Sequence, residues 1–238
     1  RALVKSATLK SIEQEILTQG TATSATVERN HEGVCPLSYA QTGVYFECLK
    51  NPLSTIYNTA CLLSYPAGIE ADRLADVVKQ VVGAHPELSV HFTTQGDSII
   101  QTLADSVAVD VPVTEMSDEA LTAYKQEYVR PFNIQRAPLY RFEVVKTESG
   151  VHLLMDVHHL VFDGGSADLF VRQLCATLEG SAAEEESYTY LDFVSDQQAA
   201  ENSDSFRDSQ AFFAENLQTC DGASEIPADL SITDQQGF

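Results

Sequence analysis

The chain has 238 residues, of which 44% are hydrophobic, and a formal net charge of −21 from 14 Lys and Arg against 35 Asp and Glu. A chain of this length can bury a full core as one large domain or two smaller ones. The acidic balance argues against nucleic acid and anionic membranes as partners. No apolar run is long enough to span a bilayer, and no signal peptide is visible.

The five cysteines are widely spaced and form no CxxC motif. This pattern predicts neither a disulfide framework nor a zinc site. It fits a reducing cytoplasm, where free cysteines act as small buried hydrophobic residues. They are Cys35, Cys48, Cys61, Cys175 and Cys220.

The N-terminal stretch looks separate from the rest of the chain. Leu9, Ile12 and Ile16 follow helical spacing, and Gly20 would end that helix. Residues 21–34 are polar and without periodicity, which predicts a linker.

A second helix is predicted from Ser38 to about Leu49. Ser38 and Gln41 have the spacing of a capping box, in which each residue caps the backbone of the other. Asn51 and Pro52 would end the helix.

From there, strands and helices alternate. Strands are predicted at 57–65, 88–94, 98–103, 139–146 and 151–158, and helices at 70–84, 117–129, 166–178, 190–200 and 205–217. Two short polar segments, 95–97 and 147–150, predict hairpin turns. This order predicts an α/β fold with a mixed sheet covered by helices.

The sharpest pattern is His-His-Leu-Val-Phe-Asp-Gly-Gly-Ser at 158–166, directly after an apolar and therefore central strand. An imidazole suits proton transfer, or hydrogen bonding to an attacking amine. Because side chains alternate along a strand, His158 and His159 should point in opposite directions, so only one would face a substrate. Asp163 could hold the loop, and Gly164 would let a substrate approach the backbone.

These residues resemble the HHxxxDGxS motif of condensation domains from nonribosomal peptide synthetases, with Ser166 as its last residue. Four other stretches resemble further motifs of that family in the family's order. They are Leu37–Gln41 with Tyr45, His85–Leu88 with Phe92, Pro131–Ile134 with Pro138–Arg141, and Tyr190–Phe193 with Gln197.

The chain also departs from the family's pattern. Arginines that are common in the first two motifs are replaced by Gly43, Ala84 and Ser89, and tryptophans of two later motifs by Gly165 and Asp196. The histidine pair and the aspartate are intact. These departures affect the assignment of the chain to a stereochemical subtype of condensation domain.

The resemblance implies a chloramphenicol-acetyltransferase-like α/β sandwich that forms one half of a V-shaped condensation domain. Residues 35–180 would be the N-terminal subdomain, and 181–238 would lead toward a C-terminal subdomain whose motifs do not occur in this chain. An exposed apolar patch near His159, or self-association that covers it, is then expected. Residues 1–20 resemble the last helix of an upstream carrier protein, with a generic amphipathic helix as the alternative.

The resemblance implies acyl transfer between two carrier-bound thioesters, with His159 as the catalytic residue, either as general base or as a group that orients the amine. His158 would be packed inside, and Asp163 would brace the loop by pairing with an arginine, either within this half or from the missing half. Gly164 would leave room for the thioester or pantetheine, and Ser166 belongs to the same supporting group. Arg141 is a candidate for a structural ion pair, with an ordinary surface arginine as the alternative.

The resemblance further implies donor and acceptor peptidyl carrier proteins and an adenylation domain as partners, in the cytoplasm. The phosphopantetheine arms would belong to the carriers, with no metal and no cofactor bound directly.

Other classes remain open. A stand-alone acyltransferase acting on coenzyme A shares HxxxDG but does not explain the other four stretches. Epimerization domains differ at the first motif, and heterocyclization domains usually lack the histidine pair. The alternative outside enzymes is a non-catalytic half-domain that binds carrier proteins.

Overall fold

The computed structural model describes residues 33–65, 68–104, 107–183 and 186–218. The helix predicted at 1–20, most of the linker predicted at 21–34 and the tail from residue 219 lie outside these residues. The chain divides into two compact units, one up to Ser195 and one from Asp196. In the part described, none of the helices has the length and apolar character needed to cross a membrane.

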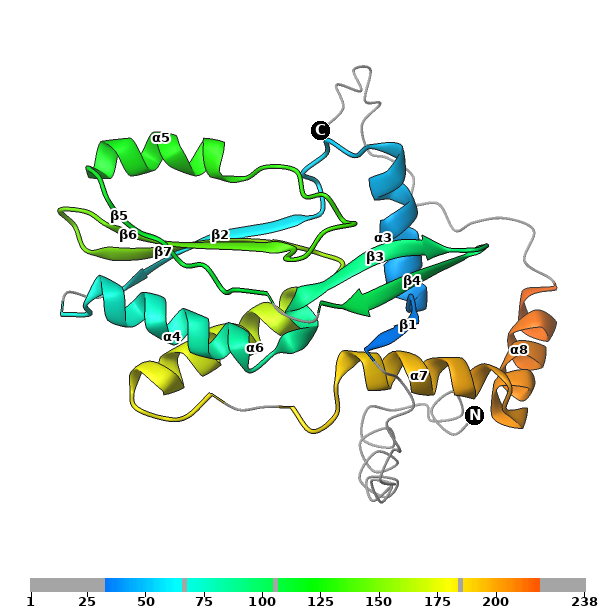
Figure 1. Cartoon of the computed structure of the whole chain (residues 1–238). Coiled ribbons are helices and arrows are strands. Elements are labelled where there is room, and N and C mark those ends of the chain that lie inside the picture. Colours follow the sequence, from blue (N-terminus) through cyan, green and yellow to red (C-terminus); the bar gives the residue numbers. More distant parts are fainter. Residues whose placement is uncertain (1–32, 66–67, 105–106, 184–185, 219–238) are drawn as a thin grey trace, which may run out of the picture. The chain divides into compact units, whose positions relative to one another are not determined.

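A four-stranded mixed sheet is the centre of the first unit (Figure 1). Its order is β2 (Asn58–Tyr65), β7 (Val151–His158), β6 (Tyr140–Lys146) and β5 (Val113–Glu115). The first three strands pair antiparallel, while β5 runs parallel to β6. The α/β class and the mixed sheet are therefore confirmed, and β7 is central and buried along its whole length.

A second sheet of three antiparallel strands was not predicted. It has the order β1 (Val34–Pro36), β4 (Ser98–Leu103) and β3 (Val90–Gln95). The hairpin turn between β3 and β4 places Gly96 at φ 60°, a conformation that favours glycine. β1 and β5 have only three residues each, too few for a hydrophobic period to be visible in the sequence.

Helices cover both faces of the four-stranded sheet, which gives the sandwich (Figure 1). α4 (Ala71–Gly83) and α6 (Gly164–Leu178) pack on one face, and α5 (Asp118–Tyr128) packs on the other. Alternate residues of β7 serve the two layers: Leu153 lies in the core with α4 and α6, and Leu154 in the core with α5. A short 3-10 helix, Pro86–Ser89, precedes β3.

α3 (Tyr39–Lys50) begins with the predicted capping box, in which Ser38 and Gln41 each accept a backbone N–H. Its Tyr45 packs with Phe92 of β3 in a separate core. The start of α7 (Tyr190–Glu201) contributes Leu191 to the same core.

The second unit contains the end of α7 and α8 (Asp204–Leu217), whose N-cap is Ser203.

The prediction that the cysteines are buried is only partly right. Cys35 is buried and Cys48 half-buried, but Cys61 and Cys175 are exposed.

Candidate active site

The motif forms a turn between the central strand and a helix. β7 ends at His158, whose N–H donates to Leu139 O at 2.9 Å, and the N–H of His159 donates to Tyr57 O at 2.8 Å. The N–H of Val161 then returns to His158 O at 3.0 Å. α6 begins at Gly164, two residues before the predicted start at Ser166.

His158 points into the protein and is 4% exposed, as strand alternation together with the family resemblance predicted. Its Nδ1 accepts the N–H of Leu160 at 3.1 Å, and its Nε2 lies 3.5 Å from Cys48 Sγ. A backbone N–H only donates, so Nδ1 is unprotonated and Nε2 carries the proton of the neutral ring. Burial, with a smaller contribution from His159, lowers the pKa of His158 to about 4.

This lowered pKa predicts a pH-dependent stability. An unfolded histidine binds a proton below about pH 6.5, whereas folded His158 binds one only near its pKa of about 4. The unfolded state therefore gains protons first, and the free energy of unfolding is expected to fall by about 3 kcal/mol as the pH drops from 6.5 to 4.

Urea denaturation of wild type and His158→Asn between pH 7 and 4 measures this effect. The asparagine side chain can accept the N–H of Leu160 but does not titrate, so the variant should lose stability less steeply. Equal pH dependence of the two proteins would contradict the assignment of a neutral His158.

His159 points the other way, is exposed, and lines a cavity of about 590 Å³. Its Nδ1 lies 2.7 Å from Phe162 O, and its ring stacks on Tyr57 with 6.5 Å between centroids and 25° between planes. Because a carbonyl oxygen only accepts, Nδ1 carries the proton. In the neutral ring, Nε2 is then the unprotonated nitrogen and can accept a proton or a hydrogen bond.

The cavity beside His159 combines carboxylates with an apolar wall. Burial raises the pKa of Glu87 within it, and Glu186 adds to this. Leu169 and Phe193, both large and exposed, also line it, which confirms the expected apolar patch near His159. The lining includes Gln41, Val44, His85, Glu87, Leu88, Leu160, Phe162, Asp163, Ser166, Leu169, Phe170, Glu186, Tyr188, Tyr190 and Phe193.

A second cavity, of about 620 Å³, is lined by His158 and not by His159. Cys48, Tyr57 and Phe132 contribute to its wall. The two adjacent histidines therefore line two different cavities.

Asp163 caps α6. Its Oδ1 accepts the backbone N–H and the hydroxyl of Ser166, both at 2.8 Å, and these two hydrogen bonds hold the pKa of Asp163 below its ordinary value. An arginine of this half was one of the two expected partners, and the ion pairs among the described residues include none at Asp163. The free N–H groups of the helix start serve the carboxylate instead. A side chain built at Gly164 would meet no atom within 4 Å, so the space beside it is open.

Asp163→Ala is expected to lower the free energy of unfolding by about 1 kcal/mol, the usual effect of losing a cap. Asp163→Ser keeps an acceptor and should stay near wild type. Because folding lowers the pKa of Asp163, the cap stabilises fully above about pH 4 and is lost as the pH falls through the lower folded value. Urea denaturation at pH 7 and pH 3 checks both points. Unchanged stability of Asp163→Ala would favour a direct chemical role for this carboxylate.

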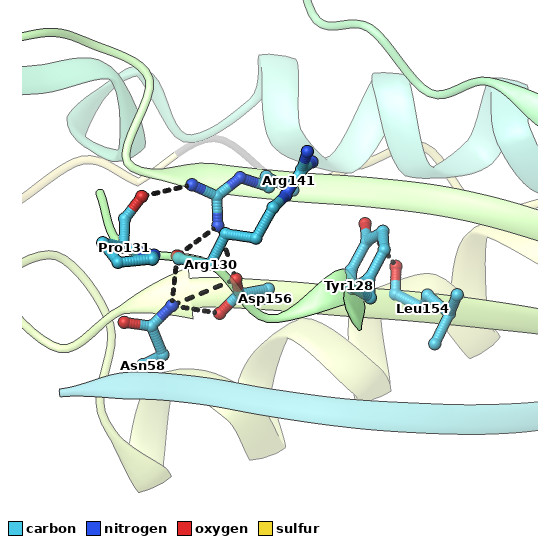
Figure 2. Close-up of polar contacts among 7 residues, drawn as sticks. All are labelled: Asn58, Tyr128, Arg130, Pro131, Arg141, Leu154 and Asp156. Atoms are coloured by element: carbon cyan, nitrogen blue, oxygen red, sulfur yellow. Dashed lines mark hydrogen bonds and ion pairs between the residues drawn. The ribbon is translucent and has the colours of Figure 1, made fainter. Parts of the chain in front are cut away.

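Arg141 takes part in a partly buried ion pair (Figure 2). Its Nη1 lies 2.6 Å from Oδ2 of Asp156, a residue with no solvent exposure, and Asn58 Nδ2 donates to both carboxylate oxygens at 2.9 and 3.0 Å. The guanidinium also donates to the carbonyls of Arg130 and Pro131 at 2.8 and 2.9 Å. The structure thus places Arg141 in an ion pair, with 23% of its side chain exposed.

Burial lowers the pKa of Arg141 and raises that of Asp156, while the attraction between the two groups opposes both changes. Neither Asp156 nor Asn58 was among the residues predicted from the sequence. The signal for Asp156 was its position as the lone carboxylate within the apolar strand before the histidines.

Gln41 is a further residue that the site prediction lacked. It is buried, and its Nε2 donates to Leu160 O at 2.9 Å, inside the turn that carries the histidines. Its side-chain amide also exchanges hydrogen bonds with that of Gln101 on β4, at 3.1 and 2.9 Å. Gln41 therefore holds α3, the second sheet and the turn together. Its place in the capping box was the signal in the sequence.

Comparison with protein families gives a match to the model described as "Condensation domain" over residues 31–238. Among curated relatives, Surfactin synthase subunit 2 of Bacillus subtilis (strain 168) is 28% identical over 204 residues. Tyrocidine synthase 2 of Brevibacillus parabrevis is 28% identical over 197 residues. These matches cover 85% and 81% of the chain but only 6% of either relative.

Solved structures share the fold. The starter condensation domain of rhizomide synthetase RzmA superposes with a TM-score of 0.69 at 21% identity, over 79% of this chain and 48% of that one. The condensation domain from Monacolin K polyketide synthase MokA gives 0.69 at 20% identity, over 80% and 44%. The chain thus spans about half the length of these domains.

Proposed function

Because the chain belongs to the condensation-domain family, we propose that it is the N-terminal half of a nonribosomal peptide synthetase condensation domain. The reaction is amide formation between an aminoacyl acceptor and an acyl donor, each held as a thioester. The observation that carries the proposal is the state of His159, whose Nδ1 is bound to Phe162 O while its ring lines the apolar-walled cavity of about 590 Å³.

The reaction needs no covalent enzyme intermediate, because the amine attacks the donor directly. The acceptor amine attacks the donor's thioester carbonyl, a C–N bond forms, and the C–S bond breaks. The amine loses one proton, and the departing sulfur ends as a thiol. Nε2 of His159 receives a hydrogen bond from the amine, which orients it, and can also take the proton as general base.

The other motif residues support this group. His158 is neutral and fixes the turn through Leu160, and Asp163 caps α6 through Ser166. Arg141 holds the loop before β6. The open space beside Gly164 suits a thioester or pantetheine arm.

The partners follow from the reaction. Donor and acceptor peptidyl carrier proteins deliver the substrates on phosphopantetheine arms, so the chain itself needs no cofactor or metal. An adenylation domain of the same synthetase selects and activates the amino acid. The proposed compartment is the cytoplasm, and neither nucleic acid nor membrane is among the partners.

A second candidate is a non-catalytic half-domain that binds carrier proteins. The observation in its favour is the exposed apolar surface of Leu169 and Phe193 beside the cavity, which a carrier protein could cover. On this view the chain binds carriers without turning them over.

Mass spectrometry of two loaded carriers separates these candidates. The chain is incubated with donor and acceptor carriers, alone and as part of a protein that also contains a second half. If amide product forms only when a second half is present, the proposal is supported and the active site of the isolated chain is incomplete. Product in neither case, with carrier binding retained, supports the binding module. Transfer from acyl-coenzyme A to an acceptor that needs no carrier would contradict both.

A further inference from the structure

We infer that Phe132 is a positioning residue that connects the partly buried Arg141–Asp156 pair to the two histidines. The inference deepens the proposed function, because it concerns how the same site is held. Phe132 lies on the loop between α5 and β6, far from the histidines in sequence. Its ring contacts both a cation and an imidazole.

The first contact of the Phe132 ring is with the guanidinium of Arg141, whose central carbon lies 3.7 Å from the ring centroid. The same guanidinium holds Asp156 and the carbonyls of Arg130 and Pro131, the two residues before Phe132 (Figure 2). A planar guanidinium can stack on a ring and donate in its own plane at once. The ring is therefore fixed by stacking and by its anchored backbone.

The second contact of the Phe132 ring is with His158. The two rings meet edge to face, with 5.9 Å between centroids and 89° between planes, a favourable arrangement for aromatic pairs. Nδ1 of His158 accepts the N–H of Leu160, which follows His159 directly. A change in the ring of His158 therefore acts on the backbone on both sides of His159.

A purely space-filling role fits Phe132 less well. The side chain is only half-buried and lines the second cavity. Leucine would fill similar space at this position but would offer neither a face to Arg141 nor a ring to His158. Lysine in place of Arg141 would keep the charge but lose the planar group. These two substitutions separate ring contacts from bulk and charge.

The test measures the histidine rings by NMR in the isolated chain with Phe132→Leu and Arg141→Lys. Both variants should raise the pKa of His158 by about one pH unit, because water gains access to the imidazole. Both should also displace the ring resonances of His159, which stacks on Tyr57. Arg172→Lys, which changes an exposed pair with Asp168 on α6, is the matched control and should change neither quantity.

A lower melting temperature with both histidines unchanged would overturn the inference, since that is the result of a merely structural role. Unfolding of both variants would overturn it as well, because Phe132 and Arg141 would then be needed for the fold as a whole. Amide formation is not the readout. If the chain forms no amide but the histidine resonances change in both variants, the result counts against the proposed function and not against the positioning role.

Discussion

His159→Ala is expected to reduce the rate of amide formation by about 10²- to 10⁴-fold, the range that a positioned acid–base group contributes. The side chain is exposed at the mouth of a cavity, so its loss should leave the melting temperature near wild type. The rate is measured from loaded carriers in a protein that carries this segment with a second half, and folding by circular dichroism.

His91→Ala is the matched control, because His91 is a half-buried histidine on β3 that lines neither cavity described above. His159→Gln separates the two roles of the imidazole. Its amide oxygen can accept a hydrogen bond from the amine but cannot serve as a base at neutral pH. Recovery of the rate by glutamine would indicate orientation, and near-normal turnover by alanine would remove His159 from the reaction.

Arg141→Ala is expected to lower the free energy of unfolding by about 3–5 kcal/mol, because removing one partner of a buried pair leaves the other charge uncompensated. Asp156 is fully buried and would keep only the amide of Asn58 among the side-chain donors described for it. The carbonyl of Pro131 would also lose its Arg141 donor, and that of Arg130 would keep only Asn58 Nδ2 of its two side-chain donors. Urea denaturation at pH 7 measures the loss.

Two comparisons make this result specific. Arg172→Ala removes an exposed pair and should change stability by less than about 1 kcal/mol. A double variant, Arg141→Met with Asp156→Leu, removes both charges and should recover part of the stability lost in Arg141→Ala. If Arg141→Ala behaves like Arg172→Ala, the pair is not a structural element of this fold.

The placement of the two histidines could be predicted because strand alternation is a local rule. The apolar run before them identified a central strand, and alternation predicted that the two side chains point in opposite directions; the family resemblance then indicated that His158 is the buried one. Their chemical states could not be predicted. Those depend on the N–H of Leu160 and the carbonyl of Phe162, and so on the exact path of the turn.

The pairing of Arg141 with Asp156 was within reach of the sequence. The predicted turn at 147–150 sets Lys146 opposite Val151, and the same register places Arg141 directly opposite Asp156. The third member, Asn58, comes from β2 through a long-range pairing with β7. A pairing between distant segments leaves no mark in the local pattern.

The cap formed by Asp163 was not predicted from the sequence. The predicted helix began at Ser166, but α6 begins at Gly164 and Asp163 is the residue before it. An aspartate at that position is served by the helix's own N–H groups. A difference of two residues in the helix start therefore hid this role.

The protonation state of the His159 ring tests the central claim most directly. Long-range ¹H–¹⁵N NMR of the isolated chain, at a pH where the ring is neutral, distinguishes the two tautomers. The account predicts a proton on Nδ1, held by Phe162 O, and an unprotonated Nε2 for the amine. A proton on Nε2 would contradict it, because the basic nitrogen would then be the one beside the Phe162 carbonyl.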